Sequence, residues 1–447
     1  MIRQNFNADW TVEKGDGNSR MNSFLGNTQT KTVHLPYDAM IHEARTPDTK
    51  NGAQTGFYPG GEYIFQKHFT APQAWQGKPV SLVFEGVYQT ALVYLNGWLL
   101  TRNVNGYAEF TVEAGPYLKY GADNLLKVIA DNSLEPNSRW YTGSGIYRPV
   151  RLLVGNKVYL PQDTVRITTR EADEGFALLD VTAQVQSAST VTERVTLQQT
   201  ICREGTAVLT DRQNLLLQPG ESRTVSFRYC VDSPALWSPE NPNLYTSTMQ
   251  VLEGEEELDR EETGFGIRTL SIDAAHGVRI NGQTVKLRGA CIHHDNGILG
   301  AATLPDAEER RIRQLKEAGF NAIRSSHHPA GRALLDACDR YGVLVMDELS
   351  DVWNVRKNPY DYALYFEQDW KPTIQKMVAK DYNHPSVILY CVGNEISEAG
   401  SESGAETNRR LCNTFRELDP TRYTTNALNG LMAACLLYTS DAADDLT

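Results

Sequence analysis

The sequence predicts three successive domains: a β jelly roll, an immunoglobulin-like β-sandwich and the first part of a (β/α)8 barrel. Through residue 269, short strand-like segments follow one another with Gly, Pro and Asn between them, which predicts two all-β domains. After residue 270, strand-like and helix-like segments alternate, which requires a parallel sheet with crossover helices.

Residues 1–155 are rich in strand-forming residues. The segments "YIFQKHF", "VSLVFEGV" and "TALVYLNGWLL" combine branched and aromatic residues, and no helical period separates them. The pair Asn96-Gly97 in "YLNGW" favours a tight hairpin turn. Many strands without helices predict a sandwich or a jelly roll.

Residues 156–269 predict a second β domain. Strand-like pieces include "TVRITTR", "ALLDVTAQV", "RVTLQQTI" and "TVSFRYCV". Pro239 and Pro242 in "LWSPENPNLY" exclude a regular helix or a central strand at that point. The strand spacing fits an immunoglobulin-like sandwich, which typically has about 100 residues.

The segment 270–434 alternates between strands and helices. The strand-like pieces are "TVKLRGACI", "FNAIRSS", "VLVMDE", "SVILYCV" and "DPTRYTTNALN", and helical patterns lie between them. No GxGxxG or phosphate-binding loop opens a helix, so a barrel is preferred to an open doubly wound sheet. The residues expected on the inward helix faces are Ile312, Leu315 and Ala318, then Leu334, Leu335 and Cys338, then Ile374, Met377 and Val378.

Four successive strands of the predicted barrel end in polar, ionisable residues, where barrels carry their chemistry. Taken alone, each of these residues has a structural explanation, such as a buried ion pair at Arg324 or a helix-start carboxylate at Glu395. Unrelated structural reasons would have to recur at four strand ends, so a functional site is expected. The candidates are His293, His294 and Asp295, then Arg324 and His327, then Asp347 and Glu348, then Asn394 and Glu395.

Composition and charge narrow the class of protein. The formal net charge of −12 argues against a nucleic-acid or anionic-membrane partner. No apolar run approaches the roughly 18 residues of a membrane span, and the start lacks the apolar core of a signal peptide, so a cytoplasmic location is expected. Seven scattered cysteines without a CxxC motif indicate reduced thiols rather than disulfides or a zinc site.

Two long motifs of the predicted barrel resemble a known enzyme family. "NAIRSSHHPAGRALLDACDRYGVLVMDE" and "DYNHPSVILYCVGNE" are similar to the two signatures of glycoside hydrolase family 2, which includes β-galactosidases, β-glucuronidases and β-mannosidases. "SRWYTGSGIYRPVRL" (138–152) resembles the end of that family's galactose-binding-like jelly roll. "LWSPENPNLY" and "FGIRT" resemble the close of its immunoglobulin-like domain. The resemblance runs from near residue 1 to about residue 430 and implies a TIM-barrel catalytic domain.

The resemblance implies a retaining mechanism with an acid/base and a nucleophile about 5–5.5 Å apart. Glu395 falls on the family's acid/base and Asn394 on the Asn that binds the sugar 2-hydroxyl. The other implied substrate-binding residues are Arg324 and His327 at the site floor, His293 and Asp295 near the non-reducing sugar, and Asp347 and Glu348 at the third strand end. Trp353 is either a stacking platform for a sugar face or a core tryptophan.

The sequence also departs from the family pattern. Tyr390 and Cys391 replace the more common Trp and Ser, and "HHP" replaces "HYP". The loop after Glu348 lacks the Glu and His that large β-galactosidases use for magnesium, so no metal is expected at the site and no cofactor is implied.

The length departs most from that pattern. Only 177 residues follow residue 270, against about 250 in a whole barrel. The family's nucleophile, a Glu after strand seven, has no counterpart here, so this chain by itself is expected to be an inactive fragment. Residues 435–447 resemble translated adapter sequence and are interpreted as foreign to the fold.

Two classes of function stay open. The first is a retaining exo-β-glycosidase that acts on a β-glycoside or oligosaccharide, with β-galactosidase as first choice and β-glucuronidase as second. The second is a non-catalytic carbohydrate-binding protein, against which the intact Asn394-Glu395 pair argues. The resemblance allows a homo-oligomer for the complete protein.

Overall fold

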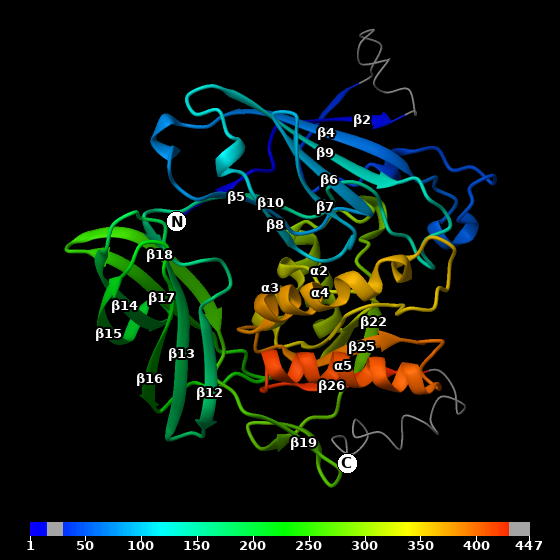
Figure 1. Ribbon diagram of the computed structural model, residues 1–447. Coiled ribbons are helices and arrows are strands. Elements are labelled where there is room, and N and C mark those ends of the chain that lie inside the picture. Colours follow the sequence, from blue (N-terminus) through cyan, green and yellow to red (C-terminus); the bar gives the residue numbers. More distant parts are fainter. Residues whose placement is uncertain (16–29, 429–447) are drawn as a thin grey trace.

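The structure is a computed structural model that describes residues 1–15 and 30–428. In Figure 1 the first domain lies at the top in blue and cyan, the second at the left in green, and the third at the lower right in yellow and orange. The predicted fold class is confirmed, with two antiparallel β domains followed by a parallel α/β domain. The boundaries at residues 155 and 269 stay predictions, and the proposed foreign tail 435–447 lies outside the described residues.

The jelly roll consists of two antiparallel sheets that pack face to face around one apolar core. The six-stranded sheet has the order β3 (Lys31–Val33), β2 (Trp10–Gly15), β4 (Gly61–Thr70), β9 (Asp123–Asn132), β6 (Thr90–Leu95) and β7 (Trp98–Asn103). The four-stranded sheet has the order β1 (Ile2–Asn5), β10 (Val150–Val154), β5 (Val80–Phe84) and β8 (Phe110–Glu113). The strict alternation of buried residues along β9 is what a sheet with one covered face requires.

The immunoglobulin-like domain is a sandwich of two four-stranded antiparallel sheets. In one sheet, β11 (Val158–Tyr159), β12 (Arg166–Ala172) and β16 (Ser222–Asp232) all pair with β13 (Phe176–Ser187). The other has the order β15 (Thr206–Leu217), β14 (Glu193–Arg203), β17 (Tyr245–Glu253) and β18 (Glu256–Phe265). Trp237 leaves this core and inserts towards the third domain, where its Nε1 donates to the carbonyl of Asp339 at 2.9 Å.

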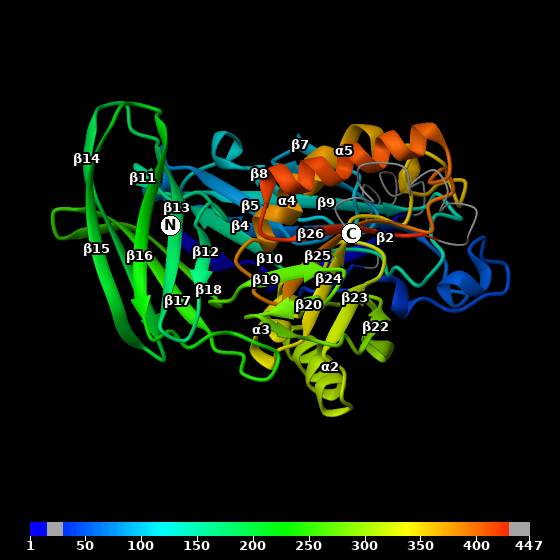
Figure 2. The same ribbon diagram turned by 90° about the horizontal axis from the view of Figure 1, so that it is seen from below.

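The third domain is built on five parallel strands in sequential order. These are β22 (Gly289–Ile292), β23 (Ala322–Ser325), β24 (Leu344–Glu348), β25 (Val387–Asn394) and β26 (Tyr423–Ala427). The connecting helices are α2 (Pro305–Glu317), α3 (Arg332–Tyr341), α4 (Phe366–Asp381) and α5 (Glu402–Leu418). Figure 2 shows α2 and α3 towards one end of the sheet and α4 and α5 towards the other. A small antiparallel sheet of β19 (Leu270–Asp273), β20 (Gly277–Ile280) and β21 (Gln283–Thr284) precedes them.

The predicted helix faces match the structure with one exception. Leu334, Leu335 and Cys338 of α3 are buried, and α3 stops at Gly342, whose left-handed φ of 64° suits glycine. Ile312 is fully buried, but Ala318 is exposed because α2 already ends at Glu317. The expected cytoplasmic location and homo-oligomer stay predictions. None of the helices in the described part of the chain is long and apolar enough to cross a membrane.

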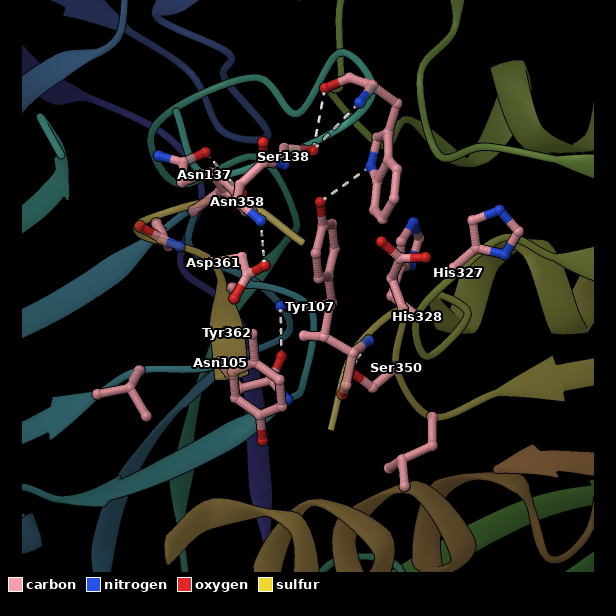
Figure 3. A pocket seen from close by; sticks show the side chains of 18 residues that line it. Asn105, Tyr107, Asn137, Ser138, His327, His328, Ser350, Asn358, Asp361 and Tyr362 are labelled. Atoms are coloured by element: carbon pink, nitrogen blue, oxygen red, sulfur yellow. Dashed lines mark hydrogen bonds between the residues drawn. The ribbon is translucent and has the colours of Figure 1, made fainter. Parts of the chain in front are cut away.

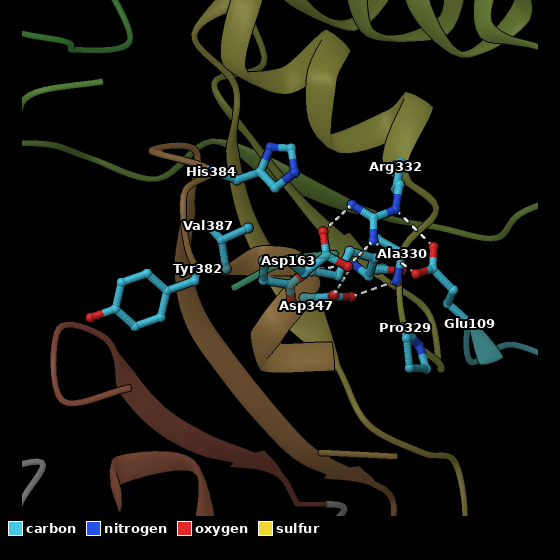
Figure 4. Close-up of polar contacts among 12 residues, drawn as sticks. Glu109, Asp163, Pro329, Ala330, Arg332, Asp347, Tyr382, His384 and Val387 are labelled. Atoms are coloured by element: carbon cyan, nitrogen blue, oxygen red, sulfur yellow. Dashed lines mark hydrogen bonds and ion pairs between the residues drawn. The ribbon is translucent and has the colours of Figure 1, made fainter. Parts of the chain in front are cut away.

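A polar cluster joins all three domains where they meet (Figure 4). Arg332, at the start of α3, donates from Nε and Nη2 to the Glu109 carboxylate of the jelly roll, both at 2.8 Å. Its Nη1 and Nη2 also reach the two carboxylate oxygens of Asp163, at 3.0 and 2.5 Å. One guanidinium therefore fixes the barrel against both β domains.

Candidate active site

The candidate site lies at the carboxyl end of the five-stranded sheet, where β25 presents Glu395. The Glu395 N–H donates to the carbonyl of Ala427 at 2.7 Å, and the Asn394 N–H donates to the carbonyl of Ser350 at 3.2 Å, so the end of β26 and the loop after β24 hold the tip. The φ of Glu395 is +45°, a conformation that costs on the order of 1 kcal/mol or more for a residue with a Cβ. A rigid, strained backbone thus aims the Glu395 side chain, which is 42% exposed.

Arg324 links the ends of three strands. Its Nη2 donates to Asn394 Oδ1 at 2.8 Å, and its Nε donates to Glu348 Oε2 at 2.5 Å. The other Glu348 oxygen lies 2.7 Å from His327 Nδ1. All four residues are candidates predicted from the strand ends, and the structure brings them together beside Glu395.

Glu348 takes a different position from the one expected. Its side chain is fully buried, so it has no surface to offer a substrate. Both of its oxygens are used to hold Arg324 and His327, whose side chains are 20% and 15% exposed. The expected substrate contact at Glu348 is therefore corrected to a support for the two residues in front of it.

Asp347 and Trp353 both lie in the interior. This corrects the expected substrate contact of Asp347, and for Trp353 it favours the core position over the stacking platform. Asp347 is fully buried, and its Oδ1 accepts the N–H groups of Ala330 and Glu348 at 2.8 and 3.0 Å. Burial and the nearby Asp381 carboxylate raise the pKa of Asp347 well above its usual value. Trp353 is fully buried and donates from Nε1 to the Val392 carbonyl at 2.9 Å, so it presents no ring face to a sugar.

Trp353 nevertheless supports the strand end. It packs under Gly393, where a side-chain Cβ would come within 2.9 Å of the Trp353 Nε1 and within 2.6 Å of Ile396. Glycine before Asn394-Glu395 is therefore required by this close approach.

Three residues of the site escaped the sequence analysis as site residues. Arg139 reaches in from the jelly roll, and its Nη1 lies 3.0 Å from Glu395 Oε2. Asp351, in the loop after β24, accepts two hydrogen bonds from Arg139, one from Asn394 Nδ2 at 2.7 Å and one from Lys357 Nζ at 2.9 Å. For Arg139 the sequence offers one signal, the motif "SRWYTGSGIYRPVRL", which was interpreted only as a marker of the domain end.

The charges around Asp351 settle its ionisation. Burial acts to raise the pKa of Asp351, but the hydrogen bonds and charges of Arg139 and Lys357 outweigh it and hold this pKa below its usual value. Burial lowers the pKa of Lys357 despite the adjacent Asp351. The hydrogen bonds that Arg139 donates to Asp351 raise the pKa of Arg139. Asp351 is therefore an anion that binds Arg139 and Lys357.

His293 and Asp295 lie at the end of the first barrel strand, but only His293 lies against other residues of the site. The His293 ring is 5.1 Å from the Trp140 ring and 5.5 Å from the His327 ring, and burial together with His327 lowers its pKa. Asp295 is half-buried. Among the described residues, no hydrogen bond joins its carboxylate to the Arg324 network.

His294 lies behind the site rather than in it. It is buried, its Nε2 lies 2.8 Å from the Thr142 carbonyl, and burial lowers its pKa to about 3. His328 stacks on Tyr107 with ring centres 3.9 Å apart, and Figure 3 shows the two rings side by side. Tyr107 in turn accepts from Trp140 Nε1 at 3.1 Å, so the imidazoles tie the jelly roll to the barrel.

The cavity drawn in Figure 3 adjoins this contact. It has a volume of about 50 Å³, and its lining includes Tyr107, Trp140, His327, Asp351 and Asp361. Ligand pockets for drug-sized molecules measure about 300–1,000 Å³, so this cavity is too small for a sugar ring. The open side of the site lies at Glu395, whose side chain is about half-exposed.

The prediction that no metal binds at the site stays a prediction. Among the described residues, one group has ligand atoms close enough to share a cation, namely Asp336, Asp339 and His384, all within 4.8 Å of one another. His384 precedes β25 and therefore lies at the opposite end of that strand from Glu395. The Nδ1 of His384 already pairs with Asp339 at 2.5 Å, and Asp339 also accepts from the Ser386 N–H, so His384 and Asp339 already have partners without a cation.

Comparison with known proteins identifies the family. Three domain profiles match in succession: the glycosyl hydrolase 2 galactose-binding domain-like profile (residues 10–176), the glycosyl hydrolases family 2 profile (158–268) and the TIM barrel domain profile of the same family (274–441). The chain is 37% identical over 406 residues to the β-galactosidase BoGH2A of Bacteroides ovatus, covering 91% of this chain and 48% of that protein. It is 31% identical over 427 residues to a putative β-glucuronidase of Formosa agariphila, covering 95% and 40%.

A solved structure agrees with these matches. The crystal structure of a family 2 member from Bacteroides cellulosilyticus superposes with a TM-score of 0.93 at 36% identity, covering all of this chain and 57% of that one. The chain spans about half the length of the curated relatives it matches. Its three domains, their order and the two barrel signatures place the chain in glycoside hydrolase family 2.

Proposed function

We propose that the protein is a retaining exo-β-glycosidase in which Glu395 is the general acid/base. The observation that carries the proposal is the Glu395 carboxylate, which a strained strand end presents to the open side of the site next to Asn394. The Arg324 and Asp351 contacts hold the Asn394 amide from both sides, at 2.8 and 2.7 Å. The family resemblance assigns this amide a hydrogen bond to the sugar 2-hydroxyl, although only 3% of Asn394 is exposed in this structure.

The two steps follow from the position of Glu395. In the first step, Glu395 gives its proton to the departing glycosidic oxygen while a carboxylate nucleophile forms an ester bond to the anomeric carbon. In the second step, the Glu395 carboxylate takes a proton from water, whose oxygen displaces the ester and retains the β configuration. The family resemblance assigns the nucleophile to a Glu after the seventh barrel strand. Strands β22 to β26 correspond to the first five barrel strands, so the double displacement requires a protein that has all eight.

The sugar proposed first is β-linked galactose. The β-galactosidase BoGH2A is the more similar of the two curated relatives compared here, at 37% against 31% identity for the putative β-glucuronidase. The second candidate is a β-glucuronide, because that relative is named for this sugar. A panel of p-nitrophenyl β-D-galactoside, β-D-glucuronide and β-D-mannoside separates these candidates, and no hydrolysis of any of them would favour the carbohydrate-binding alternative.

The test of the mechanism is Glu395→Gln in a protein with a complete barrel. Glutamine keeps the shape of the side chain but cannot transfer the proton, and loss of general acid–base catalysis costs on the order of 10²–10⁴-fold. A dinitrophenyl glycoside needs little protonation, so its first step should be spared and a glycosyl-enzyme should accumulate. Azide needs no general base and should restore turnover with a β-glycosyl azide as product.

The control for this test is Glu402→Gln, at the exposed start of α5, which should behave like the unmodified protein. Near-normal rates of Glu395→Gln on a poor leaving group would show that Glu395 is structural. An α-azide product would mean that Glu395 is the nucleophile.

A further inference from the structure

We propose that Arg139 of the jelly roll is the positioning residue of Glu395, so that the first domain completes the proton-transfer machinery of the barrel. The inference rests on the proposed function, because it assigns a role to Arg139 in the reaction of Glu395. Three sets of contacts carry it.

The first is the contact with Glu395 itself. Arg139 Nη1 lies 3.0 Å from Glu395 Oε2, and among the described residues it is the hydrogen-bond donor that the structure gives this carboxylate. The Glu395 side chain is 42% exposed, so packing restricts its rotamers only in part. Strain fixes the backbone of Glu395, and Arg139 fixes the direction of its carboxylate.

The second set of contacts makes Arg139 rigid. Its Nε and Nη2 donate to the two oxygens of Asp351, at 3.0 and 2.6 Å. The Asp351 side chain is only 10% exposed and is itself held by Asn394 Nδ2 and Lys357 Nζ. A planar guanidinium held by two parallel hydrogen bonds has a defined orientation, which a lysine ammonium in its place would lack. The third nitrogen of Arg139 is thereby aimed at Glu395.

The third set anchors the segment that carries Arg139. The next residue, Trp140, donates from Nε1 to the Tyr107 hydroxyl at 3.1 Å, and its ring lies 5.1 Å from His293 and 5.5 Å from His327. The preceding residue, Ser138, accepts the Trp140 N–H at 3.3 Å. The segment is thus seated on the barrel, and the docking of the first domain sets the place of Arg139.

A positioning role has a kinetic signature that a sugar-binding role lacks. Proton donation to the glycosidic oxygen matters most when the leaving group is basic. A misplaced general acid therefore lowers kcat/KM most for substrates with poor leaving groups. A lost contact with the sugar weakens all substrates that share this sugar by the same factor. The dependence of kcat/KM on the leaving group therefore separates the two roles.

The experiment compares variants on aryl β-D-galactosides from dinitrophenyl to phenyl, or on the matching glucuronides if the panel selects that sugar. Arg139→Met keeps much of the apolar stem and removes the guanidinium. A misplacement of about 1 Å can cost on the order of 100-fold. We expect kcat/KM to fall about 10- to 100-fold on the phenyl glycoside and less than about 3-fold on the dinitrophenyl glycoside. Arg139→Lys should restore little of this loss.

Arg102→Met is the matched control. Arg102 also belongs to the jelly roll and also reaches the barrel domain, where its Nη2 donates to the Tyr365 hydroxyl at 3.3 Å, but it makes no contact with Glu395. This variant should keep the same kcat/KM as the unmodified protein on every substrate. Circular dichroism confirms folding, and Arg139→Gln replaces Arg139→Met if the latter does not fold.

Each outcome decides between the explanations. An equal loss on all leaving groups would overturn the inference and make Arg139 a sugar contact. No loss would overturn it as well. Glu395→Gln is measured in parallel: if it shows no dependence on the leaving group, the proposed function fails. If it shows the dependence and Arg139→Met does not, only the role of Arg139 fails.

Discussion

Replacement of Arg332 by methionine should loosen the barrel from the two β domains. In the structure this guanidinium is 18% exposed and makes four hydrogen bonds with Glu109 and Asp163, whose side chains are 11% and 21% exposed. The variant leaves two largely buried carboxylates without their shared cation. Breaking a buried pair by removal of one partner costs about 3–5 kcal/mol.

The remaining contacts place the expected loss at the lower end of that range. Glu109 keeps Arg151 at 3.2 Å, and Gln162 Nε2 still donates to both Glu109 and Asp163, at 2.8 and 2.9 Å. The residual exposure of all three side chains weakens the charge interactions further. We therefore expect Arg332→Met to lose about 3 kcal/mol of unfolding free energy at pH 7.

The loss should also depend on pH. Burial acts to raise the pKa of Asp163, but the charge and hydrogen bonds of Arg332 outweigh it and leave this pKa below its usual value. A carboxylate with a lowered folded-state pKa stabilises the fold above its unfolded pKa of about 3.9, and this stability is lost as the pH falls. The unmodified protein keeps this contribution down to about pH 4 and loses it as the pH falls further, whereas the variant has none to lose. The difference between them should therefore shrink as the pH falls below about 4.

Urea unfolding followed by circular dichroism at 222 nm measures this loss, because all α-helices of the described residues lie between Pro305 and Leu418, in the domain of Arg332. The matched control is Arg170→Met, which breaks an ion pair of a 55% exposed arginine with Asp180 and should cost less than about 1 kcal/mol. Combining Arg332→Met with Glu109→Gln and Asp163→Asn removes the unpaired charges and should recover much of the loss. The reasoning is refuted if Arg332→Met behaves like Arg170→Met, or if the triple variant recovers nothing.

Three further predictions concern other parts of the molecule. Limited proteolysis should cut near residues 155 and 269, and a purified 1–269 fragment should give a β-type circular dichroism spectrum; a helical spectrum would count against these boundaries. Burial lowers the pKa of His294 to about 3, so folding favours the neutral form of this histidine. The free energy of unfolding should therefore decrease as the pH drops below about 6.5, by about 2 kcal/mol at pH 5. His294→Gln should flatten this pH dependence in urea unfolding. Trp353→Phe removes a fully buried indole and its hydrogen bond to Val392, so the free energy of unfolding should fall by about 2 kcal/mol in urea unfolding. The KM, measured in a kinetic assay, should stay unchanged. A raised KM without loss of stability would restore the stacking role.

Periodicity and strand ends explain how much of the structure was predictable. The run Ser386 to Val392 lacks alternation because both faces of β25 are covered, and the structure buries every residue of that strand. Strand β24 is likewise a run without alternation, so the sequence does not tell which of Asp347 and Glu348 faces the site. Neighbouring residues of a strand point to opposite faces, and only one face of β24 leads to the site. Sequence patterns located the strand end but not which of its two carboxylates supports Arg324.

Arg139 and Asp351 were beyond the reach of such patterns. Both lie in irregular segments, and 212 residues separate them along the chain. A loop carries no period from which a direction can be deduced, and contacts between loops depend on how whole domains dock. Glu395 was found because a strand of predictable direction ends at it, whereas its partner Arg139 depends on the placement of a different domain.

The balance of energies at Glu395 favours catalysis over a structural role. A positive φ at a residue with a Cβ costs on the order of 1 kcal/mol or more. Its ion pair with Arg139 is 42% exposed on the Glu395 side, and ion pairs of this kind contribute about 0–1 kcal/mol. The ion pair therefore offsets the backbone strain at best partly, and glycine at position 395 would avoid this strain because it has no Cβ. A carboxylate held at net cost, half-exposed and oriented by a second domain, is what proton transfer to a bound sugar requires.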